Sequence, residues 1–512
     1  MDSEQFREFG KAAVDFIIDY MDNIREQPVL PSVQPGYMRD LIPGEAPEEP
    51  ETWQEFMKDM ETIIMPGMTH WHSPQFHAFY PTANSYPAVI GELLSAGLGC
   101  VGFSWLSSPA CTELEVEMMN WLGKLLHLPE EFLNSSPGRG GGIIQGSASE
   151  STLIGLLAAK ARIVSRLTTA NPEMDVNDIR SKLVAYTSED SNSSVEKSGL
   201  LGTVPMRLLP SDDDCRLRGE TLEKAIAEDK KKGLIPCYLV ATLGTTGTCA
   251  FDRLDELGAI CQREGMWMHI DAAYAGAAFI CPEYRYLMEG VHYADSFNFN
   301  PHKWMLVNAD CSAFWVKDSH DLINTFDVQR AYLNDNGSEK TPDYRHWQIS
   351  LGRRFRALKL WAVLRLYGAS GIRKHIRKHC SLADHFKSLV LADNRFEIVS
   401  NPILGVVCFR IKGKNTLTKT LLSRLMERKN IFLVSCSYKN NFILRFVVCS
   451  RLSELHDIDF AWKEIQSQAT TILDIASDME VLGTNLEKII LCDKASPINE
   501  FVIASALEER SK

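Results

Sequence analysis

The feature that most constrains this chain is an alternation of short apolar runs with helical segments, from about residue 86 to residue 360. Three of the runs, at 141–145, 236–242 and 266–270, are predicted to be buried strands. Helical or turn sequence lies next to each of them. Short apolar strands that alternate with helices are typical of α/β domains built on a mostly parallel sheet. The pattern therefore predicts a large α/β domain at residues 86–360.

The segments on either side of this domain follow other patterns. Between residues 4 and 24, apolar side chains recur at spacings of three and four, which predicts an amphipathic helix. Six prolines between residues 28 and 50 indicate an extended connector. We therefore expect the helix to pack away from its neighbours in sequence, and residues 1–85 to form a dimerisation arm. Residues 361–480 contain apolar runs at 403–411 and 442–448, which predict a smaller α+β domain, and residues 481–512 form a tail without a usable signature.

One segment near the end of the large domain breaks the alternation. Residues 327–344 contain the polar run 334–338 and little apolar sequence. Such composition is typical of turns and surface loops. The sequence predicts an exposed, mobile loop here.

Charge and composition argue against several classes of protein. The 512 residues include 54 Lys and Arg against 66 Asp and Glu, for a formal net charge of −12, which disfavours nucleic-acid binding. No stretch approaches the roughly 18–20 uninterrupted apolar residues of a membrane span, and the first residues lack the features of a secretory signal. The 13 cysteines include no C-x-x-C pair, which fits free thiols in a reducing compartment. We expect a cytoplasmic protein.

Polar residues follow the predicted strands, where open parallel sheets bind their ligands. Gly146, Ser147, Ala148 and Ser149 follow the first strand and open a helix. Small residues there allow backbone N–H groups to approach a phosphate, although an ordinary N-cap explains the segment equally well. Asp271 follows another strand and is compatible with a helix cap, a metal ligand or a partner for a protonated heterocycle.

A lysine completes a possible cofactor site. Lys303 is flanked by aromatic residues, and an isolated lysine of this kind usually only extends its amine to solvent. Together with the phosphate cradle and Asp271, however, it forms the three parts of a pyridoxal phosphate site: a Schiff-base amine, a carboxylate for the pyridine nitrogen and a phosphate pocket. A metal site is disfavoured, because His70 and His72 have no cysteine or acidic cluster to complete a ligand set.

Several segments in register extend this interpretation to a family resemblance. They are residues 70–74, 79–82, 144–150, 271–274, 300–304 and 344–348. These segments resemble the group II PLP-dependent decarboxylases, and within that group the aromatic L-amino acid decarboxylases. The resemblance implies a type I, aminotransferase-like PLP fold and a homodimer with the active site at its interface.

The resemblance also assigns roles to individual residues. Lys303 matches the Schiff-base lysine and Asp271 the pyridinium partner. Tyr332, in the predicted loop, matches a tyrosine that protonates the carbanion after CO2 has left. The residues that match cofactor contacts are Ala148, Ser149, Thr246, Ala273, Asn300 and His302. The residues that match the substrate pocket are Phe79, Tyr80, Pro81, Thr82, Asn192 and Phe103, the last in a segment that reaches the partner's site.

Two positions depart from the decarboxylases. Asn192 stands where those enzymes have a histidine stacked over the cofactor ring, and an amide does not titrate near neutrality as imidazole does. Phe79 and Tyr80 stand in the reverse of the decarboxylase order, which moves a phenol hydroxyl by one residue. Both departures resemble the insect aromatic aldehyde synthases. The implied reaction converts L-DOPA, O2 and water into 3,4-dihydroxyphenylacetaldehyde, CO2, NH3 and H2O2.

An ordinary aromatic amino acid decarboxylase that makes dopamine remains the alternative. The two outcomes differ in whether the carbanion left by decarboxylation is protonated or reacts with O2. A tenfold preference requires only about 1.4 kcal/mol between the two barriers. Asn192 can weaken the approach of the Tyr332 hydroxyl or leave room for O2 at the ring face. A catalytically silent scaffold is disfavoured, because Lys303 and Asp271 are both present.

Overall fold

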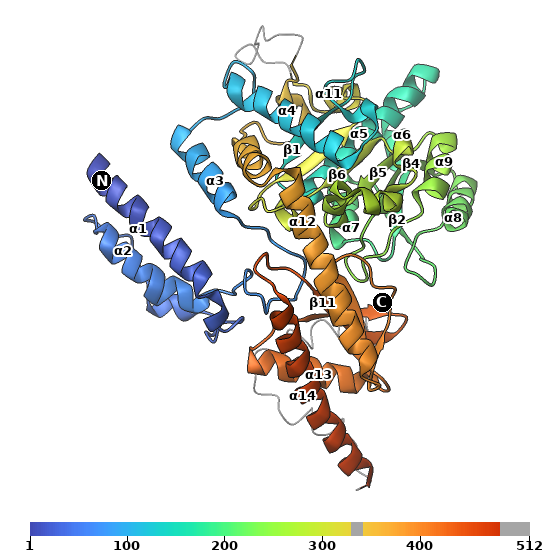
Figure 1. Cartoon of the computed structure of the whole chain (residues 1–512). Coiled ribbons are helices and arrows are strands. Elements are labelled where there is room, and N and C mark those ends of the chain that lie inside the picture. The colour runs from blue at the N-terminus through green and yellow to red at the C-terminus, as the bar shows by residue number, and fades with distance from the viewer. Residues whose placement is uncertain (329–340, 482–512) are drawn as a thin grey trace. The chain divides into compact units, whose positions relative to one another are not determined.

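The computed structural model describes residues 1–328 and 341–481, which divide into two compact units (Figure 1). The large unit comprises residues 82–380 and 400–404. The small unit comprises residues 1–81, 381–399 and the chain from residue 405. The domain boundaries that the sequence places after residues 85, 360 and 480 stay predictions.

A seven-stranded sheet organises the large unit. Its strands are β1 (Gly141–Gln145), β2 (Leu183–Ser188), β3 (Met206–Leu209), β4 (Ile235–Thr242), β5 (Trp267–Asp271), β6 (Ser296–Phe299) and β7 (Ser312–Val316). They lie in the order β1-β7-β6-β5-β4-β2-β3. Strand β7 is antiparallel to both of its neighbours, and the other pairs are parallel. The prediction of an α/β fold with a mostly parallel sheet is confirmed.

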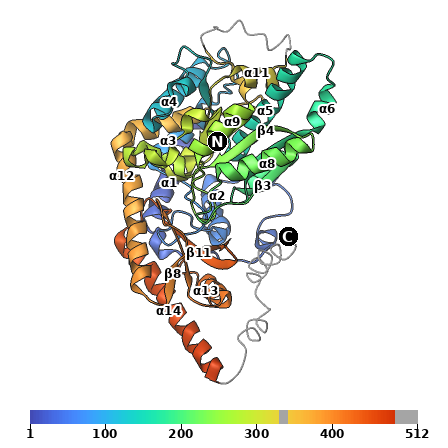
Figure 2. The same ribbon diagram turned by 90° about the vertical axis from the view of Figure 1, so that its right-hand side faces the viewer.

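Helices cover this sheet, and short polar side chains cap the first five of them. The helices of the large unit are α3 (Tyr86–Leu98), α4 (Pro109–Leu126), α5 (Ala148–Ala170), α6 (Val176–Ser181), α7 (Ser193–Gly202), α8 (Gly219–Lys231), α9 (Leu254–Glu264), α10 (Pro301–Trp304) and α11 (His320–Phe326). Helix α5 contacts five strands from β1 to β7, and α8 and α9 lie beside β4 (Figure 2). At Gly155 of α5, a Cβ would lie 2.8 Å from the Tyr238 hydroxyl of β4, so only glycine allows this close approach.

The small unit contains a four-stranded antiparallel sheet with helices on it. Its strands lie in the order β10-β11-β9-β8, and Phe386 stacks on Phe446 in its core with ring centroids 3.7 Å apart. Its elements are α1 (Ser3–Asp22), α2 (Trp53–Asp59), β8 (Phe396–Ile398), β9 (Val406–Ile411), α13 (Asn415–Arg428), β10 (Val434–Tyr438), β11 (Asn441–Val447) and α14 (Leu455–Val481). Helix α12 (Arg356–Ala392) belongs partly to each unit and contains a break at Gly368, whose φ is 65°. No helix in the ranges that the structure describes is long and apolar enough to cross a membrane.

One local expectation is wrong, and another is wrong at a single residue. Helix α1 does not pack away from its neighbours in sequence, because Phe9 stacks on Trp53 of α2 at 5.7 Å and contacts Phe56 edge-on. Tyr344, the last residue of the predicted exposed loop, is buried and donates a hydrogen bond from its hydroxyl to the Gly142 carbonyl at 2.9 Å. Aromatic burial outweighs the polar composition of the neighbouring residues. Residues 329–340 of that loop, with Tyr332, lie outside the described residues.

Candidate active site

The candidate active site lies at the edge of the large sheet where the parallel strands β4, β5 and β6 end. Thr242, Asp271 and Asn298 are register partners on these three neighbouring strands, and all three are buried. Ligands of open α/β sheets bind at this carboxyl edge. Asp271 therefore lies between two polar side chains at the middle of the edge.

Asp271 is a buried acid with a cation close to it. Burial raises the pKa of Asp271, while the Lys303 charge and one hydrogen bond oppose the increase. The backbone N–H of Ala273 donates that bond to Oδ1 at 3.0 Å. A carboxylate in such surroundings is stabilised in its charged form by positive partners. The environment suits a group that pairs with a bound cation.

Backbone hydrogen bonds bring Lys303 to the same edge. The Asn300 N–H donates to the Ala273 carbonyl at 3.0 Å, and the Lys303 N–H donates to the Asn300 carbonyl at 2.9 Å. The Ser312 hydroxyl donates to Oδ1 of Asn300 at 2.8 Å and fixes that amide. The short helix α10, which begins at Pro301, thus places Lys303 one turn beyond the end of β6. The structure brings Asp271, Ala273, Asn300 and Lys303 together.

His302 is held as a neutral imidazole beside Lys303. The Cys311 N–H donates to Nδ1 of His302 at 2.8 Å, so the proton of the neutral ring is on Nε2. Burial and the Lys303 charge lower the pKa of His302 to about 4. The His302 carbonyl accepts a hydrogen bond from the Ala83 N–H at 2.7 Å, which places Thr82 near this turn.

The start of α5 forms the predicted phosphate side of the site. Ser147 caps the helix, because its hydroxyl accepts a hydrogen bond from the Glu150 N–H at 3.2 Å. The Glu150 carboxylate accepts another from the Gly146 N–H at 3.1 Å. Ala148 and Ser149 follow in the first turn, where N–H groups have no partner within the helix and the helix dipole favours an anion.

Asn192 and Thr246 are joined directly. Asn192 caps α7 by accepting a hydrogen bond on Oδ1 from the Ser194 N–H at 3.0 Å. Its Nδ2 donates to Oγ1 of Thr246 at 2.9 Å. Both ends of the amide are therefore engaged, and its orientation is fixed. Thr246 lies in the loop that follows β4.

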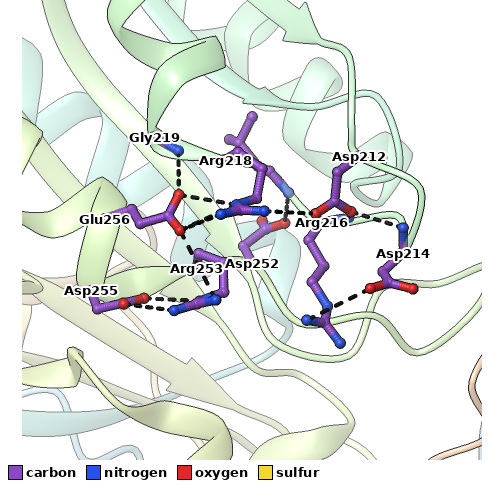
Figure 3. A network of polar contacts seen from close by, with 10 residues as sticks. Asp212, Asp214, Arg216, Arg218, Gly219, Asp252, Arg253, Asp255 and Glu256 are labelled. Atoms are coloured by element: carbon purple, nitrogen blue, oxygen red, sulfur yellow. Dashed lines mark hydrogen bonds and ion pairs between the residues drawn. The ribbon is translucent and has the colours of Figure 1, made fainter.

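Asp252 supports that loop and was missed by the sequence interpretation. Its carboxylate accepts hydrogen bonds from the Thr242 and Leu217 N–H groups, both at 2.7 Å. The bond from Thr242 ties the two ends of the segment that carries Thr246, and the bond from Leu217 holds that segment to the chain before α8. Burial raises the pKa of Asp252 to about 7. The ion pairs near it are formed by Arg218, Asp212, Glu256, Arg253 and Asp255 (Figure 3). An acid after a turn carries no signal in sequence that separates this role from many others.

The remaining predicted residues lie in other segments. Phe79, Tyr80 and Pro81 belong to the small unit, where the Arg445 guanidinium lies 4.9 Å from the centre of the Tyr80 ring. Phe79 has a φ of 52° and stacks on Trp71 at 5.4 Å. Phe103 lies between α3 and α4 in the large unit. Tyr332 is outside the described residues.

The donor set fits pyridoxal 5'-phosphate. The edge offers a helix N-terminus for a phosphate, a buried carboxylate for a protonated ring nitrogen and an amine for an aldehyde. Thr242 lies beside Asp271 on the neighbouring strand. Its hydroxyl oxygen is buried and has no hydrogen-bond partner among the described residues. Within the same residues, no group of three or more His, Cys, Asp or Glu side chains could hold a metal ion.

Comparisons with known proteins agree with this geometry. The pyridoxal-dependent decarboxylase conserved domain matches residues 35–412. Aromatic-L-amino-acid decarboxylase from Drosophila melanogaster is 55% identical over 469 residues, 92% of this chain and 92% of the relative. The 3,4-dihydroxyphenylacetaldehyde synthase of Aedes aegypti is 52% identical over 503 residues, 98% of this chain and 96% of the relative.

A solved structure extends the likeness to the fold. The crystal structure of Oryza sativa TDC with PLP and tryptamine is 35% identical, with a TM-score of 0.89, and the match covers 92% of this chain and 99% of that one. The predicted PLP fold and cofactor are thereby confirmed. The chain belongs to the family of pyridoxal-dependent decarboxylases.

Proposed function

We propose that this enzyme is an aromatic aldehyde synthase. It converts L-DOPA, O2 and water into 3,4-dihydroxyphenylacetaldehyde, CO2, NH3 and H2O2. The observation that carries the proposal is Asn192, held by Thr246 at the edge of the site, where the sequence resemblance expects a histidine in a decarboxylase. Overall likeness does not decide between the two reactions, because relatives of both kinds are about equally similar to this chain.

The chemistry of Asn192 separates the two outcomes. A histidine carries a proton that it can exchange near neutral pH, whereas an amide cannot. Since Nδ2 donates to Thr246 and Oδ1 accepts from Ser194, the amide is also fixed in place. It therefore neither supplies a proton to the reacting carbon nor fills the space of an imidazole. Both effects favour reaction with O2 over protonation.

The other residues of the edge have supporting roles in this proposal. When bound, pyridoxal 5'-phosphate supplies an electron sink that allows the substrate carboxylate to leave as CO2. Lys303 provides the amine that attaches the aldehyde, and Asp271 holds a proton on the pyridine nitrogen. Ala148, Ser149, Thr246, Ala273, Asn300 and His302 contact the cofactor.

Substrate recognition completes the proposed site. Thr82 binds the substrate carboxylate. Phe79, Tyr80 and Pro81 line the aromatic pocket together with Phe103 of the partner subunit. Tyr332 remains able to protonate the reacting carbon, so some dopamine is expected as a side product.

The decisive experiment measures H2O2 and CO2 together, from PLP-loaded enzyme given L-DOPA in air. Near one peroxide per CO2, with little dopamine, supports the aldehyde synthase. Asn192→His is expected to lower the peroxide-to-CO2 ratio at least tenfold, the equivalent of about 1.4 kcal/mol between the two barriers. Asn192→Gln keeps an amide and serves as the matched control, with an unchanged ratio.

The ordinary decarboxylase is the second candidate and predicts different products. Its support is the 55% identity to the Drosophila melanogaster decarboxylase. CO2 with stoichiometric dopamine and almost no peroxide would establish it. An unchanged peroxide yield in Asn192→His would show that Asn192 is not the switch.

We further propose a cytoplasmic homodimer. Helix α3 exposes Ile90, Leu93, Leu94 and Leu98, an apolar face of the kind that a subunit interface buries. Among the described residues, the cysteines form no disulfide and most are buried, which fits a reducing compartment. Light scattering at micromolar concentration measures the subunit number, and a monomer would contradict the proposal.

A further inference from the structure

Two cysteines of the large unit lie sulfur to sulfur. The Sγ atoms of Cys100 and Cys111 are 3.0 Å apart, although a loop and the first residues of α4 lie between them in sequence. Cys100 follows Gly99, which ends α3 with a φ of 59°, and Cys111 lies in the first turn of α4. A disulfide bond requires about 2.05 Å between the sulfur atoms, so a small movement would close it.

The two thiols differ in their surroundings. Cys111 is buried, at 5% exposure, whereas Cys100 is partly exposed. Burial raises the pKa of Cys111 to about 12, and the neighbouring Cys100 and Glu115 act in the same direction against a hydrogen bond with Ser108. Cys111 is therefore a poor first target for peroxide, and its proton leaves only as its sulfur attacks the oxidised sulfur of Cys100. In the single chain, the Cys100 sulfur is the more accessible of the two to a small oxidant, and Cys111 is placed to react with the oxidised sulfur.

The segment between the two cysteines folds back over Cys111. At Gly102, a Cβ would lie 2.6 Å from the Cβ of Cys111, so the backbone passes directly across that side chain. The Gly102 N–H also donates to the Arg353 carbonyl at 3.2 Å. Phe103 comes next, and Ser108 ends the segment by capping α4 with a hydrogen bond from the Cys111 N–H at 3.4 Å.

We propose that Cys100 and Cys111 are a peroxide-sensitive thiol pair whose disulfide restrains the segment bearing Phe103. Hydrogen peroxide oxidises the Cys100 thiol to a sulfenic acid, and one water leaves. The Cys111 sulfur then attacks the sulfur of the sulfenic acid, its proton leaves with the hydroxyl group as a second water, and the S–S bond forms. Two thiols are oxidised to one disulfide, and one peroxide is reduced to two waters. That the enzyme itself produces this peroxide rests on the proposed function.

The disulfide has a predicted effect on substrate binding. It would fix Cys100 to the first turn of α4 and shift the residues between them, including Phe103. Because Phe103 is proposed to line the partner's substrate site, the KM for L-DOPA rises while kcat changes less. Turnover would thereby slow as peroxide accumulates, and a thiol reductant would reverse the effect.

The test uses PLP-loaded full-length enzyme, with H2O2 added directly. After blocking of free thiols and digestion without reductant, mass spectrometry is expected to find the peptides of Cys100 and Cys111 linked, with two hydrogens lost. The KM for L-DOPA is expected to rise at least threefold and to return with dithiothreitol. Cys100→Ser and Cys111→Ser should each keep their KM within 1.5-fold through the same treatment, whereas Cys436→Ser, which removes another partly exposed cysteine, should respond like the wild type.

Three results would overturn the proposal. They are no linked peptide after peroxide treatment, a link that leaves KM unchanged, and an equal rise of KM in the Cys100→Ser variant. Peroxide release during turnover is measured separately in untreated enzyme. A chain that releases no peroxide yet links the two cysteines with added peroxide would retain the thiol pair and lose the proposed aldehyde synthase activity.

Discussion

At the scale of single residues, Asp271 combines burial with a nearby cation. Burial disfavours its charged form, and the Lys303 charge opposes that effect. Such an acid is costly to bury unless a positive partner compensates it. A protonated pyridine nitrogen would be such a partner, and the carboxylate would in turn keep that nitrogen protonated.

Replacing this carboxylate tests its role. We expect Asp271→Asn to lower the rate of CO2 release at least 100-fold and to weaken cofactor retention, because an amide cannot compensate a positive ring nitrogen. Radiometric CO2 assays and the visible absorbance of the dialysed enzyme measure the two effects. Asp255→Asn removes a partly exposed carboxylate of α9 and should change neither. Activity of Asp271→Asn within threefold of the wild type would contradict the role.

Residues of the site differ in how far sequence predicts them. Lys303, Asp271 and Ser147 follow apolar runs, so their position at the carboxyl edge follows from the alternation of strands and helices. The role of Asp252 does not follow from this alternation, because it depends on two N–H groups that are brought together only when the chain closes around the carboxylate. The bond between Asn192 and Thr246 likewise joins loops after two different strands.

At the scale of elements, one buried ion pair joins three segments of the large unit. Oε1 of Glu115 on α4 accepts hydrogen bonds from the Ile144 N–H of β1, at 2.7 Å, and from the Arg353 guanidinium. Arg353 also donates to Oε1 of Gln348 at 2.5 Å and lies over the Tyr344 ring. The side chains of Glu115 and Arg353 are 4% and 2% exposed.

Breaking this pair should destabilise the fold. Glu115→Gln leaves the Arg353 charge buried without its counterion, and loss of one partner of such a pair costs about 3–5 kcal/mol. Urea unfolding followed by circular dichroism measures the loss. Glu117→Gln, at an exposed position of the same helix, is the control and should stay within about 0.5 kcal/mol. A loss in Glu115→Gln no larger than in the control would show that the pair does not stabilise the fold.

The order of the strands marks the limit of sequence patterns at this scale. Apolar runs predict that β1, β4 and β5 exist and where each ends, to within about a residue. They do not show that β7 lies antiparallel between β1 and β6. That arrangement depends on pairing between residues far apart in sequence, which no local pattern encodes.

At the scale of the whole molecule, the fold does not by itself determine which of the two reactions takes place. Relatives with both activities are about equally similar to this chain, so overall likeness does not decide between aldehyde and amine. In the function proposed above, that choice depends on a few side chains at the sheet edge. Stability, by contrast, depends on groups spread through both units. Among these are histidines buried in neutral form, which make the folded state sensitive to acid.

His77 of the small unit shows the effect most clearly. It is fully buried, its ring stacks on Phe446 at 4.0 Å, and Nδ1 donates to the Val447 carbonyl at 3.1 Å. Burial lowers the pKa of His77 to about 4, and that of His269 in the large unit to about 3. Between pH 6.5 and these values the unfolded chain binds more protons than the folded one, so stability present above pH 6.5 is lost as pH falls.

The expected loss can be measured and assigned to His77. Between pH 8 and pH 5, the shift of His77 alone removes about 2 kcal/mol from the free energy of unfolding. His77→Phe keeps a ring against Phe446 but cannot titrate, so its urea midpoint should fall less over this range than that of the wild type. His456→Gln, which removes an exposed histidine, is the matched control and should follow the wild type. Equal pH dependence in His77→Phe and the wild type would show that His77 is not among the groups that set the acid limit of the fold.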